Sequence, residues 1–398
     1  MLHTVLAINF GALLMAFAPT LRAWAAAPTA VVPVEHGAWS WLLTACAAGV
    51  LAWSLRNANA AARHFRRATW RRRGLAQGSA TGGRQVLVTG ATGFIGRHLV
   101  YRLIARGDRV TVLARNRAKA EDLFGPHATI VENLGAIPSD ARLDAIVNLA
   151  GEPIAARPWT AARRRELVAS RLAVTSALLG LAGRLATRPR TWVNASAVGY
   201  YGVRPDDEPL HEKSEPQPVF QSELCRRWET AAGQAAKLGV KVALLRIGLV
   251  LGLDGGALPA LARPVRLHLG LRFGDGAQWV SWIHVDDLVA LILFVLDEEM
   301  LAGPVNATAP VPVRHAELMS AIAWALGRKL LPFGVPAWAL RALLGELARL
   351  FVDGQRVIPA RATALGFRFR YVTIEDALAD LLRSRSATAV VGAVSARH

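Results

Sequence analysis

The sequence predicts an α/β fold with a doubly wound parallel sheet, a smaller C-terminal lid region and a hydrophobic N-terminal segment suited to a membrane. Three observations support this prediction. Glycines at three-residue spacing follow a short apolar run at residues 86–88. From residue 85 onward, strand-like runs alternate with helical patterns, as in sheets whose parallel strands are joined by helices. The first 57 residues are mostly apolar, and the chain has a mean hydropathy of +0.29.

The N-terminal region, residues 1–57, is expected to cross a membrane. Residues 4–21 and 37–55 are uncharged, and each run is about long enough to span a hydrocarbon core. Arginines at positions 56–73 follow the second run, so the positive-inside rule places the globular part in the cytoplasm, at the inner membrane. Several topologies stay open: both runs span the membrane, the second spans it alone, or the first is a signal-like segment. A further alternative is that the gene start is assigned too early, in which case the protein is cytoplasmic. Residues 58–84 are expected to form an Arg-rich juxtamembrane segment and linker.

Residues 1–84 carry +8 of the net charge of +18, and the remaining +10 is spread over more than three hundred residues. We interpret it as contact with anionic membrane lipids. Nucleic acid is not expected as a partner, because no strip of interleaved aromatic and basic residues stands out. The two cysteines, Cys46 and Cys225, cannot form a disulfide framework, and no Cys/His cluster has the spacing of metal ligands.

The apolar run at 86–88 leads through glycines into a pattern of helical spacing. Such a turn exposes backbone N–H groups at a helix N-terminus, where phosphate binds. The first glycine permits the tight bend, the second lets a pyrophosphate approach, and the third lets the helix pack on the strand. The sequence therefore predicts a Rossmann-type dinucleotide site. The cofactor-binding residues expected at this turn are Gly90, Thr92, Gly93, Phe94, Ile95 and Gly96.

The chain beyond this turn continues the alternation. Strands are expected at 110–113, 145–149, 191–196 and 241–247, and helices at 158–181 and 221–238. Parallel sheets bind ligands beyond the carboxyl ends of their strands, where Gly151, Ser196 and Gly248 fall. The Rossmann-type domain is expected to span residues 85–332.

The end of the second strand indicates which cofactor is bound. Enzymes that select NAD usually carry Asp or Glu there, whereas this chain has Arg115 and Arg117. Guanidinium groups pair well with a 2′-phosphate, so we expect NADP(H) in preference to NAD(H). The alternative is that both arginines are simply solvated.

Several motifs together resemble the extended short-chain dehydrogenase/reductases, and within them the branch of NAD(P)-dependent nucleoside-diphosphate-sugar epimerases. These motifs are residues 89–96, 148–154, 159–160, 196–202, 224–229 and 281–288. The resemblance implies that Leu149, Ala150 and Gly151 line the cofactor site. Residues 333–384 resemble the small C-terminal domain of that branch, a domain of unknown function, and residues 385–398 are expected to be a disordered tail.

The resemblance also exposes a gap. Superfamily enzymes generally use a Tyr, with a Lys four residues on, to move a proton, and no Lys of this chain stands four residues after a Tyr. The candidate substitutes are Ser196 at a strand end, Tyr200 in the following loop and Glu152 after another strand. Their alternative roles are a strand-end cap, a packing aromatic and an acid that complements a helix dipole. Cys225 is expected to be a core residue rather than a nucleophile.

Residues 252–276, rich in Gly and Pro, predict a substrate lid. In similar enzymes this region contacts the diphosphate of a sugar nucleotide, and Arg263 and Arg266 suit that contact. Gln278 and Trp282 are expected to flank the substrate, with ordinary packing as the alternative for the tryptophan.

Two functions are consistent with these observations. The first is an NAD(P)-dependent epimerase or oxidoreductase that acts on a sugar nucleotide or a related hydroxyl or carbonyl compound, with a homodimer as a candidate assembly. The second is an NADP(H)-binding sensor or scaffold at the membrane with reduced catalysis, which the missing Tyr–Lys pair favours. We favour the enzyme, although this fold serves many functions.

Overall fold

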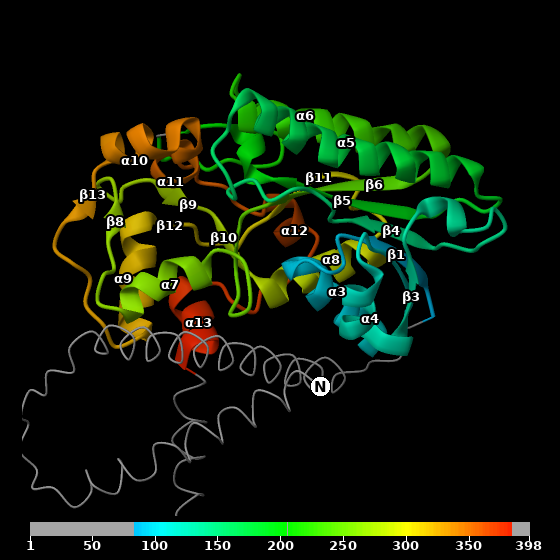
Figure 1. Ribbon diagram of the computed structural model, residues 1–398, viewed down its shortest axis with the longest axis horizontal. Coiled ribbons are helices and arrows are strands. Elements are labelled where there is room, and N and C mark those ends of the chain that lie inside the picture. Colours follow the sequence, from blue (N-terminus) through cyan, green and yellow to red (C-terminus); the bar gives the residue numbers. More distant parts are fainter. Residues whose placement is uncertain (1–82, 205, 384–398) are drawn as a thin grey trace, which may run out of the picture. The chain divides into compact units, whose positions relative to one another are not determined.

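The computed structural model describes residues 83–204 and 206–383 (Figure 1). The predictions for the membrane region 1–57, for residues 58–82 and for the C-terminal tail lie outside the described residues. The described part is built around a seven-stranded sheet with the order β11-β6-β5-β4-β1-β2-β3, and all of its strands are parallel. The predicted doubly wound α/β fold is therefore confirmed.

The bounds of the sheet elements follow the predicted alternation. The strands are β1 (Gln85–Thr89), β2 (Arg109–Leu113), β3 (Ala128–Val131), β4 (Ala145–Asn148), β5 (Thr191–Ala197), β6 (Lys241–Ile247) and β11 (Gly303–Ala307). The helices between them are α3 (Phe94–Ala105), α4 (Arg117–Phe124), α5 (Ala161–Arg184), α6 (Phe220–Gly233) and α8 (Val285–Asp297). The sequence prediction missed β3 and β11, which are the two edge strands.

Both faces of the sheet are covered by helices. Helices α5 and α6 lie on one face, and α3, α4 and α8 lie on the other (Figure 1). Because successive side chains of a strand point to opposite faces, Val86 and Val88 pack with Leu99 of α3, whereas Leu87 packs with Leu178 of α5. This burial on both faces explains why β1 is an uninterrupted apolar run rather than an alternating one.

The long helix α5 begins later than the sequence predicts. Thr160 caps it, since its hydroxyl accepts a hydrogen bond from the backbone N–H of Arg163 at 3.1 Å. Trp159, which the sequence assigned to the helix, is buried before the cap. Within the described residues, α5 alone is long and apolar enough to span a membrane, but its Leu167 and Leu178 are buried in the protein core. It is a core helix of this fold.

The remaining elements belong to the C-terminal part. Its strands are β7 (Leu249–Leu251), β8 (Arg272–Phe273), β9 (Trp279–Val280), β10 (Trp282–His284), β12 (Val313–Arg314) and β13 (Gly334–Val335). Its helices are α7 (Leu258–Arg266), α9 (His315–Ala325), α10 (Ala337–Leu344), α11 (Arg349–Val352), α12 (Ala360–Ala364) and α13 (Ile374–Leu378). The predicted lid, residues 252–276, therefore contains a helix and a short strand.

Candidate functional site

The turn between β1 and α3 has the backbone geometry that the glycines predicted. Gly90 adopts a positive φ of 67°, and a Cβ atom there would lie 2.5 Å from the carbonyl oxygen of Leu149. A Cβ atom on Gly96 would lie 2.3 Å from the oxygen of Gly90. Gly93 is exposed at the N-cap of α3 and supplies no side-chain cap, so the first N–H groups of the helix stay available for an anion. These residues fit the pyrophosphate of a dinucleotide.

The side chains of Phe94 and Ile95 are half-buried and pack against neighbouring residues. A Cβ on either Gly252 or Gly255 would lie 2.5 Å from the ring of Phe94, so the loop after β7 wraps closely around that ring. Ile95 packs against the core beneath α3. Thr92, also predicted here, is half-buried in the turn.

Asp254 connects this loop to helix α3. Its carboxylate forms an ion pair with Arg97 at 2.8 Å and a contact with the Nε2 atom of His98 at 3.1 Å. Burial alone would raise the pKa of Asp254, but the hydrogen bonds and charges of these two partners outweigh it and leave the pKa lowered. The lid therefore begins from a point that is anchored to α3.

The structure gives the two predicted 2′-phosphate ligands different environments. Arg117 donates hydrogen bonds to Glu121 at 2.8 Å and to the carbonyl oxygen of Ile130 at 3.2 Å. Arg115 is 94% exposed, and its nearest carboxylate partner is Glu152, at 3.6 Å. Arg115 can thus turn toward a ligand at the carboxyl end of β2 without breaking an internal hydrogen bond that holds it.

The loop after β4 is fixed by hydrogen bonds at its start. The N–H of Leu149 donates to Thr89 at 3.2 Å, and the N–H of Ala150 donates to the side chain of Asn148 at 3.3 Å. Gly151 is exposed, and a Cβ there would approach the guanidinium of Arg171 at 3.2 Å. Leu149 and Ala150 therefore lie beside the first glycine turn, since a Cβ on Gly90 would lie 2.5 Å from the oxygen of Leu149 and 2.9 Å from the nitrogen of Ala150.

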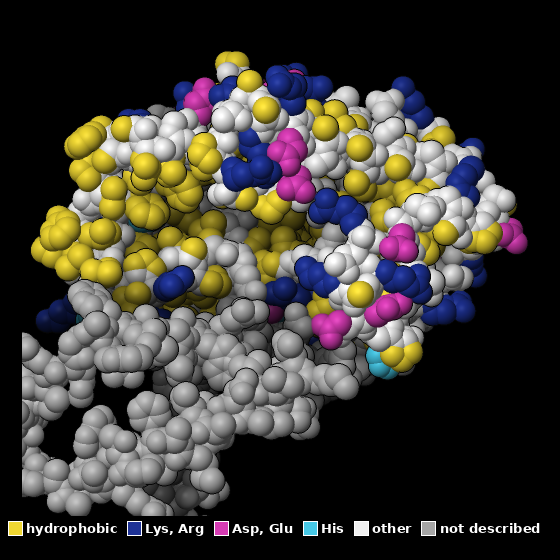
Figure 2. Space-filling view, in the orientation of Figure 1, with side chains coloured by type: hydrophobic (Ala, Val, Ile, Leu, Met, Phe, Trp, Pro, Cys, Tyr) yellow, Lys and Arg dark blue, Asp and Glu magenta, His cyan; other side chains and the backbone are white. Residues whose placement is uncertain are grey.

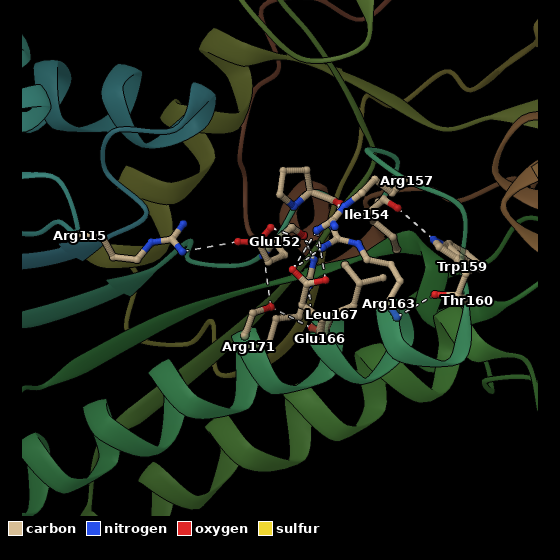
Figure 3. Close-up of polar contacts among 12 residues, drawn as sticks. Arg115, Glu152, Ile154, Arg157, Trp159, Thr160, Arg163, Glu166, Leu167 and Arg171 are labelled. Carbon is tan, nitrogen blue, oxygen red and sulfur yellow. Dashed lines mark hydrogen bonds and ion pairs between the residues drawn. The ribbon is translucent and has the colours of Figure 1, made fainter.

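Glu152 lies among arginines (Figure 3). One carboxylate oxygen is 3.6 Å from Arg115, and the other is 3.6 Å from Arg163. Its backbone oxygen accepts a hydrogen bond from Arg171 at 3.1 Å. Arg163 also pairs with Glu166 at 2.8 Å, so the cluster joins the loop after β4 to the start of α5. This environment gives Glu152 an ion-pairing role.

Ser196 is part of a buried ionic network. Its hydroxyl donates to the Oε1 atom of Glu229 at 2.7 Å. Arg246 holds both oxygens of that carboxylate, with Nε and Nη2 each 2.9 Å away. The side chains of Glu229 and Arg246 are only 8% and 4% exposed. Arg246 also donates to the hydroxyl of Tyr201 at 3.1 Å, and that hydroxyl donates to Asn306 at 2.6 Å.

The two adjacent tyrosines have different roles in this network. Tyr201 is fully buried, and burial raises its pKa to about 12. Tyr200 is half-buried, and the guanidinium of Arg246 lies 3.3 Å from the centre of its ring. Tyr200 is therefore the one of the pair whose phenol is not held inside the core.

Gln221 and Cys225 lie four residues apart on α6. Gln221 is buried against Gly199. Burial raises the pKa of the Cys225 thiol to about 11, and its Sγ lies 3.7 Å from the carbonyl oxygen of Ala197. Cys225 is thus a core residue, as the sequence predicted, because a buried thiol of raised pKa is inert.

The predicted substrate residues of the lid do not share one environment. Arg263 and Arg266 are exposed in the last turn of α7. The side-chain nitrogen of Gln278 donates to two backbone oxygens, those of Phe273 and Phe351, which leaves it no hydrogen for a substrate. The prediction for Trp282 is wrong, because its side chain is completely buried and its indole N–H donates to Val311 at 2.9 Å.

Sequence reasoning missed Glu229 and Arg246 as site residues. Glu229 occurred only within the motif on α6, and Arg246 only within an expected strand. A signal was available, since a lone arginine in the apolar strand Lys241–Ile247 requires a buried partner. No group of His, Cys, Asp or Glu side chains within the described ranges could hold a metal ion.

Comparisons with known proteins agree with this geometry. Residues 86–306 match the NAD dependent epimerase/dehydratase family, and residues 335–381 match a domain of unknown function, DUF1731. An Arabidopsis thaliana chloroplast protein, the epimerase family protein SDR39U1 homolog, is 43% identical over 75% of this chain and 86% of its own length.

Solved structures show the same likeness. The human epimerase family protein SDR39U1 with NADPH has a TM-score of 0.67 and 32% identity, over 75% of this chain and 99% of the human one. A nucleoside-diphosphate sugar epimerase from Corynebacterium glutamicum has a TM-score of 0.61 and 32% identity, over 80% of this chain and 62% of that one. This chain therefore belongs to the NAD dependent epimerase/dehydratase family.

Proposed function

We propose that the chain binds NADP(H) and transfers hydride to or from a carbon bearing a hydroxyl or carbonyl group, in the epimerisation or reduction of a sugar nucleotide or a related compound. The observation that carries this proposal is the open N-terminus of α3 beneath Gly90, Gly93 and Gly96. The dinucleotide, when bound, supplies the hydride chemistry, and the protein supplies binding, orientation and polarisation.

Arg115 supports the choice of NADP(H). It lies after β2, is almost fully exposed and is the better placed of the two arginines to meet a 2′-phosphate. The human relative, which shares 32% identity, was solved with NADPH. Arg115→Ala should weaken NADPH binding about tenfold, because a charge-assisted pair contributes roughly 1.5 kcal/mol, and should leave NADH binding unchanged. Arg117→Ala is the matched control, with a smaller expected effect because Arg117 is bound to Glu121.

Proton handling is assigned to Ser196 and Tyr200. Because the hydroxyl hydrogen of Ser196 points to Glu229, its lone pairs are left to accept a hydrogen bond from a substrate hydroxyl. Tyr201 and Tyr371 are buried, and the hydroxyl of Tyr101 donates to Leu123, so Tyr200 is the phenol best suited to exchange a proton. Glu152 is the weakest of the predicted catalytic residues, because arginines face both of its carboxylate oxygens.

Arg263 and Arg266 support a substrate with a diphosphate, since exposed guanidinium groups suit phosphate oxygens. The Corynebacterium relative is described as a nucleoside-diphosphate sugar epimerase. Charge reversal of both arginines should raise KM for a sugar nucleotide and leave NADPH affinity unchanged. If the double variant weakened NADPH binding as much as it raised KM for the sugar nucleotide, these arginines would belong to the cofactor site instead.

The missing Tyr–Lys pair favours a second candidate, an NADP(H)-binding sensor or scaffold with reduced catalysis. Fluorescence titration of the full-length protein with NADPH and NADH, followed by product analysis over a sugar-nucleotide panel, separates the two. The enzyme should bind NADPH more tightly and form product. Tight NADPH binding with no turnover on any substrate would favour the sensor, and tighter binding of NADH would contradict the role of Arg115.

Membrane anchorage through residues 1–57, with the globular part in the cytoplasm, also belongs to this proposal, as does a homodimer. The uncharged runs 4–21 and 37–55 and the arginines after them support the anchorage. A reporter enzyme fused after residue 73 should be active only in the cytoplasm. Periplasmic activity would reverse the orientation, and a fully soluble full-length protein would refute the anchorage.

A further inference from the structure

The C-terminal part carries an apolar helix that the rest of the described structure covers only in part, since Leu344 packs on a buried cluster whereas other large side chains are exposed. Seven of the eight residues of α10 are apolar, yet none of them is buried. A helix with so many apolar residues is normally enclosed by a protein core or a bilayer on most of its surface. On α10, Trp338 is 73% exposed and Leu343 is 78% exposed. Such exposure of large side chains indicates a contact surface.

Neighbouring segments extend this exposed region. The N–H of Leu331 donates to Gly270 at 2.9 Å, and β13 pairs with β8, so the segment before α10 runs beside the segment after α7. Figure 2 shows hydrophobic side chains gathered over this part of the molecule. We define the α10 surface as the exposed residues Leu267, Leu269, Phe333, Trp338 and Leu343.

Cations predominate in the segments that carry the α10 surface, although one of them, Arg341, lies 3.5 Å from the carboxylate of Asp353. Residues 267–274 and 324–345 contain no Asp or Glu. Their cations are Arg272, Arg328, Lys329 and Arg341. A second copy docked through a two-fold axis would bring these cations near their own counterparts, which is unfavourable. An apolar surface with a cationic rim instead suits a bilayer that contains anionic lipids.

We propose that the α10 surface rests on an anionic lipid bilayer, with Trp338, Leu343 and Phe333 entering the interface between headgroups and acyl chains. Stable attachment to a membrane generally requires two signals, and here the apolar side chains and the cationic rim provide both. This contact is independent of the proposed catalysis. The uncharged runs 4–21 and 37–55 would add to it by holding the surface near the bilayer.

Photocrosslinking of the full-length protein tests the proposal. The photoreactive residue p-benzoylphenylalanine replaces Trp338, and the protein is mixed with phosphatidylcholine vesicles with or without phosphatidylglycerol. Replacing Met300 provides the matched control, because Met300 is also 72% exposed but lies beside Glu298 and Glu299. We expect lipid adducts at position 338, more with phosphatidylglycerol, and none above background at position 300. Thermal melting verifies that both variants fold.

The rim is tested by Arg328→Glu combined with Lys329→Glu, which should lower the adduct yield at position 338 about tenfold in anionic vesicles. Adducts to a second copy of the chain would overturn the proposal in favour of a protein interface. Equal lipid adducts at positions 338 and 300, or none at either, would overturn it as well. If the double charge reversal leaves the adduct yield at position 338 unchanged, the cations do not contribute to lipid binding.

Discussion

Glu229→Gln tests whether the buried network holds Ser196 in place. The carboxylate accepts three hydrogen bonds, one from Ser196 at 2.7 Å and two from Arg246 at 2.9 Å each. Glutamine keeps the volume but replaces one acceptor oxygen with an NH₂ group, which then faces a guanidinium N–H. It also leaves the charge of Arg246 buried and uncompensated.

The expected loss is large because both side chains are almost completely buried. Removing one partner of a buried ion pair costs about 3–5 kcal/mol. For a domain of this size, that loss corresponds to a fall in Tm of about 6–10 °C. Urea denaturation followed by tryptophan fluorescence would measure the free energy of unfolding of the full-length variant directly.

A control on the same helix separates charge from burial. Glu223→Gln removes an exposed carboxylate that pairs with Arg226 at 3.2 Å, and it should cost less than about 0.5 kcal/mol. The double variant Glu229→Met/Arg246→Met should be more stable than Arg246→Met alone, because it leaves no buried charge without a partner. A cost below about 1 kcal/mol for Glu229→Gln would refute the reasoning.

Three further predictions follow from the same geometry. Gly90→Ala forces a Cβ to within 2.5 Å of Leu149 at a positive φ, so urea denaturation should show a loss of about 2 kcal/mol and titration should show weaker NADPH binding; unchanged values would contradict the turn. Asp254 has a lowered pKa, so its contribution is complete above the unfolded pKa of about 3.9 and is lost as the pH falls through the folded value. The Tm gap between wild type and Asp254→Asn should therefore be constant at neutral pH and close in acid; a gap that persists there would refute the ion pair. In a Cys46→Ser background, Cys225 should resist iodoacetamide until the protein unfolds, since burial raises its pKa to about 11; alkylation of the native protein would place it at the surface.

The order of the main sheet elements was predictable because each carries its own local pattern. Strand β6 begins at Lys241 and ends at Ile247, as its apolar run indicates. The edge strand β11 lacks such a run, since it consists of Gly303–Ala307 and contains Gly, Pro and Asn. Its place in the sheet depends on pairing with β6, which no local pattern records.

The cofactor turn and the ionic network differ in how far apart in the sequence their residues lie. Gly90 and Gly96 are six positions apart, and their requirement for glycine comes from one bend and its contact with Leu149, so spacing alone locates them. Ser196, Glu229 and Arg246 meet only after β5, α6 and β6 have packed together. Spacing in the sequence can therefore locate a site formed by the backbone of one turn. A site formed by side chains from separate elements can be recognised only once the three-dimensional structure is known. Ser196 shows the consequence: its position at a strand end was predictable, but the direction of its hydroxyl, which determines whether it donates or accepts, is set by the carboxylate of Glu229 on helix α6.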